Sequence, residues 1–235
     1  MRVFSLTIFL MLFGINFSFA ELPGLDLNRL DYGKYILTYE EHYYDGIGES
    51  VLTIEKYRKG YLAVWEGITD ITEVYTDLNF NTQKMVITDK DTSITAERQG
   101  NILKVNGIDE GKIVEENLIL KASKWYQLLS FSLIPFSISN DKKIEFALFD
   151  PYNVKVRNMK IDKKGTEIIT IFEEEVLSVK LSMRMKGVLS PFWKSELWNN
   201  PESGIHLKYE GINVIPSFYK AQILLEKIEF QEIPN

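Results

Sequence analysis

The stretch VLSVKLSMRMK, residues Val176 to Lys186, decides the fold class of this chain. Its last ten residues alternate without a fault between apolar positions (Leu177, Val179, Leu181, Met183 and Met185) and polar positions (Ser178, Lys180, Ser182, Arg184 and Lys186). A period of two is typical of a strand that turns one face to a core and the other to water. Sheets with one solvated face are antiparallel, so the stretch predicts an antiparallel sheet.

Turn signals divide the rest of the chain into short runs that are rich in Ile, Val, Tyr, Phe and Thr. The clearest signals are Asp45–Gly48, Lys59-Gly60, Gln99–Asn101, Asn106-Gly107, Lys164-Gly165 and Ser203-Gly204. They predict hairpins that pair residues 34–44 with 49–58, 94–98 with 102–105, and 193–198 with 205–209. We therefore expect an all-β protein with a single strongly curved antiparallel sheet, or half-open β-barrel, of about ten strands.

An uncharged segment, WYQLLSFSLIPFSISN from Trp125 to Asn140, breaks this pattern of strands. Ser123 is a suitable helix cap, and Pro135 would end a helix near Ile134. The segment predicts one short covering helix near residues 124–134, followed by extended chain. No internal repeat and no Pro/Ser-rich linker divides the sequence, so residues 21–235 are expected to form a single β-rich domain.

The first twenty residues, MRVFSLTIFLMLFGINFSFA, have the pattern of a secretory signal peptide. Arg2 precedes an apolar run from Val3 to Phe13, and Ser18 and Ala20 are small residues at the positions that a signal peptidase reads. The alternative is an uncleaved anchor, but a spanning helix needs about 20 apolar residues and this run is shorter. We expect residues 1–20 to be cleaved after Ala20, which leaves a soluble periplasmic protein without a stable membrane anchor.

Composition excludes several classes of partner and chemistry. The formal net charge of −6 argues against binding to nucleic acid and against electrostatic docking on anionic lipid. The chain has no Cys, which rules out disulfides, a lipoprotein anchor and thiolate chemistry. An exported chain of this size without disulfides fits a bacterial periplasm.

No residue pattern names a reaction, a metal or a cofactor. His42 and His206 are the only histidines, too few for a His-based metal site, and both are expected to be ordinary strand residues. Neither a Gly-x-Ser-x-Gly elbow nor a Gly-rich phosphate loop is present. The acidic runs Glu173–Glu175 and Asp89–Asp91 are more typical of a solvated loop or sheet edge than of a glycosidase pair. We expect no catalytic residues, no metal, no cofactor and no enzymatic activity.

The aromatic residues are the most suggestive set. A curved sheet lined with aromatic side chains can hold an apolar ligand, and the uncharged segment could cover its concave face. The candidate ligand-binding residues are Trp125, Leu128, Phe131, Phe136 and Trp193. The alternative is that these side chains fill a core and leave no cavity.

The stretch WKSELWNNPESGIHLKYEG, which begins at Trp193, resembles the closing hairpin of a bacterial periplasmic family of unknown function. A Tyr-rich first hairpin (Tyr35–Val51), an aspartate-rich middle hairpin (Asp89–Val105) and the short apolar helix agree with that resemblance. The family is similar to carriers of the LolA and LolB type, although this chain lacks the lipobox Cys of LolB. The resemblance implies a half-open β-barrel and the handling of lipid or lipoprotein, and it implies no catalytic residues.

These observations lead to a non-catalytic function in the cell envelope. The first hypothesis is binding or carriage of an apolar ligand, such as an acyl chain or a lipoprotein, inside the curved sheet. The alternative is an assembly or scaffold protein that binds another envelope protein through a sheet edge or an apolar patch, without a ligand cavity. A hydrolase that uses carboxylates on carbohydrate is a distant third.

Overall fold

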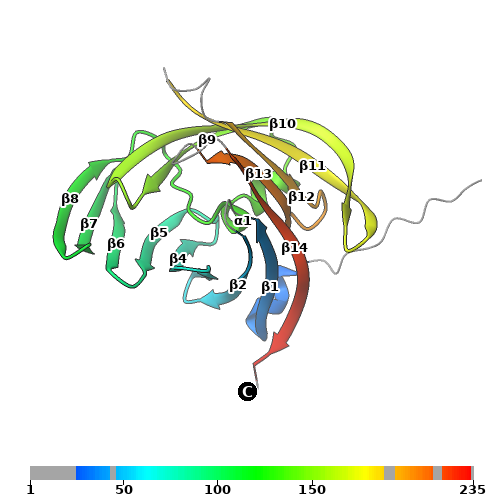
Figure 1. Ribbon diagram of the computed structural model, residues 1–235, viewed down its shortest axis with the longest axis horizontal. Helices are drawn as coiled ribbons and strands as arrows, with labels where there is room; N and C mark the ends of the chain where they lie inside the picture. Colours follow the sequence, from blue (N-terminus) through cyan, green and yellow to red (C-terminus); the bar gives the residue numbers. More distant parts are fainter. Residues whose placement is uncertain (1–24, 43–45, 188–193, 214–218, 234–235) are drawn as a thin grey trace, which may run out of the picture.

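The computed structural model describes residues 25–42, 46–187, 194–213 and 219–233, with the backbone alone at 212–213 and 219–220 (Figure 1). A short 3₁₀ helix, η1 (Leu27–Asp31), precedes the first strand, and two short helices, α1 (Leu129–Ser132) and α2 (Ile134–Ile138), lie mid-chain. The strands are β1 (Gly33–His42), β2 (Ile47–Tyr57), β3 (Gly60–Glu66), β4 (Ile71–Asp77), β5 (Thr82–Thr88), β6 (Thr92–Gln99), β7 (Ile102–Asp109), β8 (Lys112–Ile119), β9 (Lys143–Asp150), β10 (Lys155–Ile171), β11 (Glu174–Met185), β12 (Lys194–Asn199), β13 (His206–Asn213) and β14 (Tyr219–Glu232).

All these strands belong to one 14-stranded antiparallel sheet in the order β8-β7-β6-β5-β4-β3-β2-β1-β14-β13-β12-β11-β10-β9. Two meanders, β1–β8 and β9–β14, join where β1 pairs with β14. The sheet curves strongly but does not close, as Figure 1 shows. The expected all-β class with a single curved antiparallel sheet is confirmed. The strand number exceeds the expected ten because two-residue connections, such as Arg58-Lys59 and Glu110-Gly111, fit more strands into the same length.

Residues 120–142, the connector, cross the interior of the curved sheet from β8 to β9 (Figure 1). Its helices differ from the single helix expected at 124–134. Pro135 does not end a helix near Ile134 but lies in the first turn of α2, where its missing N–H costs nothing. Ser123 does not cap a helix, because the chain from Lys124 to Gln127 is extended.

The extended part of the connector is hydrogen-bonded to both meanders. Tyr126 N donates to Ala147 O at 3.0 Å, and Ala147 N donates to Lys124 O at 2.8 Å, on the outer edge of β9. From the other side, Thr82 N donates to Trp125 O at 2.9 Å. The connector therefore provides partners for some of the backbone N–H and C=O groups on the open edge of β9, and it is also hydrogen-bonded to the start of β5.

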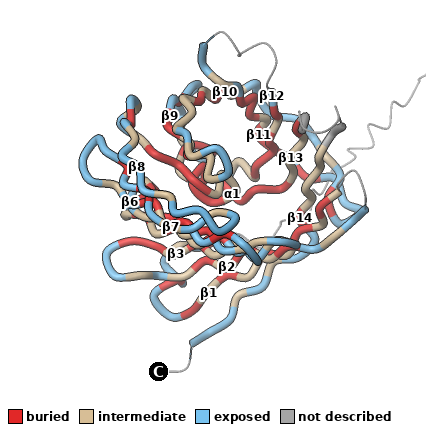
Figure 2. Tube along the Cα trace, turned by 60° about the vertical axis from the view of Figure 1, so that its left-hand side comes forward, coloured by how far each residue is buried: buried red, intermediate tan, exposed pale blue. Residues whose placement is uncertain are grey.

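Side chains of the connector enter each of the three apolar clusters that form the core. Leu120 and Trp125 pack in the β4–β7 cluster, Phe131 and Ile134 in the cluster of β1–β3 and β13–β14, and Tyr126, Leu133 and Phe136 in the β9–β12 cluster. Figure 2 shows the connector around α1 as mostly buried. The connector thus forms the centre of the core, because each part of the inner face of the sheet buries its apolar side chains against it.

The alternation of apolar and polar residues from Leu177 to Lys186 holds over most of β11. Val179, Leu181 and Met183 are buried on the inner face as expected. The expectation for Leu177 is wrong: its side chain is 41% exposed, and Val176 faces the core instead. A β-bulge between Lys163 and Gly165 in the partner strand β10 shifts the register nearby, and a bulge bends the strand and re-aims the side chains beyond it.

Candidate functional site

An apolar cavity of about 250 Å³ lies between the start of the connector helices and the inner face of β1, β3 and β12–β14. Its apolar lining comes from Trp65, Leu128, Leu129, Leu197 and Ile223. Glu41, Ser130, His206 and Tyr209 add a small number of polar groups. A mainly apolar lining with a few converging polar groups is the usual constitution of a small-molecule site.

Leu128 gives this side of the cavity its shape. The residue precedes α1 and has a left-handed backbone with φ 45°. A branched residue is rarely found in that region, and such strain is concentrated at functional sites. The turn at Leu128 presents three consecutive residues, Leu128 to Ser130, to the cavity.

Glu41 supplies the cavity with a buried carboxyl group. It continues the inner row of β1, after Tyr35, Leu37 and Tyr39, and its residue surface is only 6% exposed. Its Oε1 has no hydrogen-bond partner among the described residues, nor does the hydroxyl of Ser50. Burial raises the pKa of Glu41; the nearby Ser50 hydroxyl acts in the opposite direction, and the charge of Asp70 adds to the increase.

His206 belongs to a buried polar network at the start of β13. Its Nδ1 lies 3.0 Å from Oδ1 of Asn199, and Nδ2 of Asn199 donates to Oγ of Ser137 at 2.8 Å and to the carbonyl of Gly204 at 3.2 Å. Since Asn199 uses its amide N–H groups there, its Oδ1 accepts from Nδ1–H of His206, which leaves Nε2 as the unprotonated nitrogen. Burial lowers the pKa of His206 to about 3.

The structure separates the residues that the sequence suggested as ligand-binding. Leu128 lines the cavity. Trp125, Phe131 and Phe136 are 0%, 0% and 3% exposed and are packed within the core clusters, so for them the alternative of a filled core holds. Trp193 lies outside the described residues.

Neither Glu41 nor His206, the two buried polar residues of the cavity, was predicted from sequence as a site residue. The alternation of Tyr35, Leu37 and Tyr39, continued by two residues, places Glu41 on the buried face of β1. The sequence therefore contained a signal for the burial of Glu41. His206 was expected to be an ordinary strand residue. No sequence pattern indicates its network, because Asn199 and Ser137 are brought together from distant parts of the chain.

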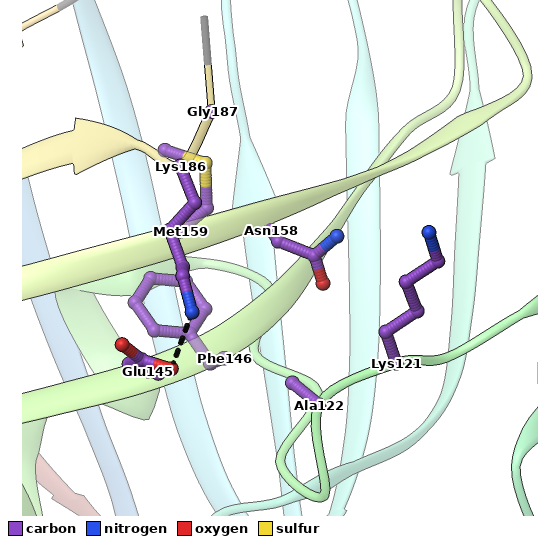
Figure 3. Close-up of a pocket in the computed structure, with 8 residues that line it drawn as sticks. All are labelled: Lys121, Ala122, Glu145, Phe146, Asn158, Met159, Lys186 and Gly187. Carbon is purple, nitrogen blue, oxygen red and sulfur yellow. Dashed lines mark hydrogen bonds and ion pairs between the residues drawn. The ribbon is translucent and has the colours of Figure 1, made fainter. Parts of the chain in front are cut away.

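A second depression, of about 340 Å³, lies where the segment after β8 faces β9 and β10 (Figure 3). Lys121 and Ala122 lie on one side and Glu145, Asn158 and Lys186 on the other. Nζ of Lys186 is 2.7 Å from Oε2 of Glu145, and the bond with Lys186 lowers the pKa of that carboxyl. Its lining is about as polar as it is apolar, and its charged side chains Lys186 and Glu145 already pair with each other, so the apolar cavity is the stronger candidate.

The described residue ranges hold no group of three His, Cys, Asp or Glu side chains placed to bind a metal ion. None of the helices within these ranges has the length and hydropathy needed to cross a bilayer.

Comparison with known proteins supports the fold alone. No protein-family model matches the chain, and no curated protein matches its sequence significantly. The structure is similar to that of a beta-barrel-like protein of the domain of unknown function DUF1849 from Brucella abortus, with a TM-score of 0.56, 11% identity, and coverage of 86% of this chain and 98% of that one. The likeness agrees with a β-barrel-like fold of unknown function and does not point to LolA or LolB in particular.

Two further structures show weaker likeness. The hypothetical lipoprotein YmcC from Escherichia coli gives a TM-score of 0.42, with 10% identity and coverage of 82% of this chain and 84% of that one. An exported protein with a YmcC-like fold from Bacteroides fragilis gives 0.33, with 12% identity and coverage of 84% and 96%. Neither value is high enough to support an argument about this chain.

Proposed function

We propose that this chain is an exported periplasmic protein that binds a small apolar ligand without chemical conversion. The observation that carries the proposal is the cavity beside Leu128, which is lined mainly by apolar side chains. The sequence of residues 1–20 supports export, with cleavage after Ala20.

The connector limits the size of the ligand. Since it fills most of the interior, the free space is about 250 Å³ rather than a lumen that would hold a complete lipid. This volume is enough for about eight groups of ~30 Å³, the size of a water molecule. The ligand that fits this volume is an alkyl or acyl chain of about eight carbon atoms, or the end of a longer chain.

The chemistry of His206 supports binding rather than catalysis. In hydrolytic sites a carboxylate orients the histidine and stabilises the imidazolium that forms. Here Nδ1 of His206 bonds to the neutral amide of Asn199. With a pKa of about 3, this imidazole is a weak base at neutral pH, far from the value that suits a general base.

The proposal is tested by titrating the protein with 1-octanol in a calorimeter. We expect saturable binding to the unmodified protein and at least tenfold weaker binding to Ser130→Phe, which places a ring in the cavity. Asn140→Phe, which adds the same ring at an exposed connector position, is the matched control and should bind octanol as the unmodified protein does. Absence of saturable binding, or equal affinity in both variants, would exclude this cavity as the site.

The second candidate function is docking of another envelope protein on the open edge of β8. This strand ends the sheet, and two of its isoleucines, Ile113 and Ile119, are 84% and 66% exposed. An incoming strand could continue the sheet there through backbone hydrogen bonds. A negative octanol titration would leave this candidate as the better account of the exposed isoleucines.

A further inference from the structure

We infer that the cavity recognises the positively charged head of an alkylammonium ion, through the carboxyl group of Glu41, Nε2 of His206 and the aromatic side chains of Trp65 and Tyr209. The inference rests on the proposed function, because it assigns a head group to the ligand of the same cavity. It adds a chemical class that an apolar lining alone does not specify.

The first argument is charge. Glu41 is buried, and its Oε1 lacks a hydrogen-bond partner among the described residues. Among the described residues that line the cavity there is no Lys or Arg. A buried carboxyl oxygen without a donor is costly, and a ligand that brings N–H donors and a positive charge removes that cost. A carboxylate or phosphate head would find no cation among the described lining residues to offset its charge.

The second argument is the supply of hydrogen-bond acceptors. A primary ammonium group has three donors and no acceptor. Asn199 fixes the tautomer of His206 so that Nε2 is an acceptor, and both His206 and Glu41 line the cavity. The hydroxyl of Tyr209 already shares a hydrogen bond of 2.9 Å with Ser195, which leaves oxygen lone pairs to accept another. Three acceptors of this kind match an ammonium group and offer little to an anion.

The third argument is the aromatic lining. Trp65 and Tyr209 both line the cavity, and Trp65 is held in place by Tyr39, with ring centroids 5.3 Å apart. Aromatic rings attract cations through their quadrupole, by about 0.5–2 kcal/mol, and sites for organic ammonium ions are often built from such rings. Leu128, Leu197 and Ile223 complete the wall and would contact the alkyl body of the ligand.

The test compares three ligands of equal chain length, octylammonium, 1-octanol and octanoate, at neutral pH and fixed ionic strength by calorimetry. We expect octylammonium to bind the unmodified protein at least tenfold more tightly than octanol, and octanoate to bind most weakly. In Glu41→Gln, the preference for octylammonium over octanol should fall to threefold or less. Glu40→Gln is the control, because Glu40 is the neighbouring carboxyl on β1, points to the other face and pairs with His42, so it should keep the preference.

The outcomes separate this inference from the proposed function. If octanol binds and octylammonium binds no more tightly, the cavity takes an apolar ligand but the inference is overturned. Retention of the full preference in Glu41→Gln overturns it as well. If none of the three ligands binds, the proposed function itself fails. The order of affinities of the three ligands for the unmodified protein tests the inference even if a variant does not fold. Octyltrimethylammonium, which lacks N–H donors, shows how much of the preference for a cation comes from the aromatic rings.

Discussion

Replacing Phe131 with alanine should lower the free energy of unfolding by about 3–5 kcal/mol, the cost typical of removing a fully buried phenylalanine ring. Phe131 is 0% exposed, and its ring centroid lies 4.8 Å from that of Phe80 and 6.1 Å from that of Tyr61. The substitution leaves a void where the connector meets the first meander, and neighbouring strands cannot collapse into it without losing their hydrogen bonds. Urea denaturation followed by circular dichroism measures the change.

Ile138→Ala is the matched control for this prediction. Ile138 lies on the same connector, at the end of α2, but is half exposed, so its truncation should change the unfolding free energy by less than about 0.5 kcal/mol. A loss below about 1.5 kcal/mol in Phe131→Ala would contradict the description of the connector as part of the core. It would show instead that the connector lies loosely on the sheet.

The second large effect is a loss of stability in acid that depends on His206. In the folded protein burial lowers its pKa from 6.5 to about 3. Below pH 6.5 the unfolded chain therefore binds a proton at this residue while the folded protein does not, so the free energy of unfolding falls as the pH drops from 6.5 towards 3. At about 1.36 kcal/mol per pKa unit, the contribution amounts to some 4–5 kcal/mol over the whole range.

The measurement is the free energy of unfolding between pH 7 and pH 4 for the unmodified protein and for His206→Gln. Carboxyl groups also titrate in this range, so the relevant quantity is the difference between the two profiles. We expect that difference to move in favour of the variant by about 2 kcal/mol or more as the pH falls to 4.5. Parallel profiles for the unmodified protein and His206→Gln would contradict the burial of His206.

The sheet was predictable from sequence because a strand with one buried face leaves a local pattern. The run from Val179 to Met185 is an example, and its inner side chains lie where their spacing places them. Leu177 departs from the pattern near a bulge that lies in the partner strand β10, between Lys163 and Gly165. The sequence of β11 alone gives no sign of that bulge. The predicted helix boundaries were wrong because Pro135 is compatible both with the end of one helix and with the first turn of the next.

The site was less predictable than the sheet. Trp125, Phe131 and Phe136 were plausible ligand contacts because the sequence does not distinguish an aromatic residue that lines a cavity from one that fills a core. Only the three-dimensional path of the connector distinguishes the two cases. Leu128, which was also predicted as a ligand contact, lines the cavity. Its left-handed backbone has no signal in sequence, since a leucine rarely adopts it.

The most direct test of the central claim, that a ligand occupies the cavity beside Leu128, is quenching of tryptophan fluorescence by an octanol with a terminal bromine. Bromine quenches only on contact, and Trp65 lines the cavity. Trp198 is the control, because its ring lies on the outer face of β12, with the ammonium groups of Lys180 and Lys208 4.7 and 5.1 Å from its centroid. We expect saturable quenching in the unmodified protein and in Trp198→Phe, and its loss in Trp65→Phe. Saturable quenching that persists undiminished in Trp65→Phe, or no saturable quenching at all, would contradict the account.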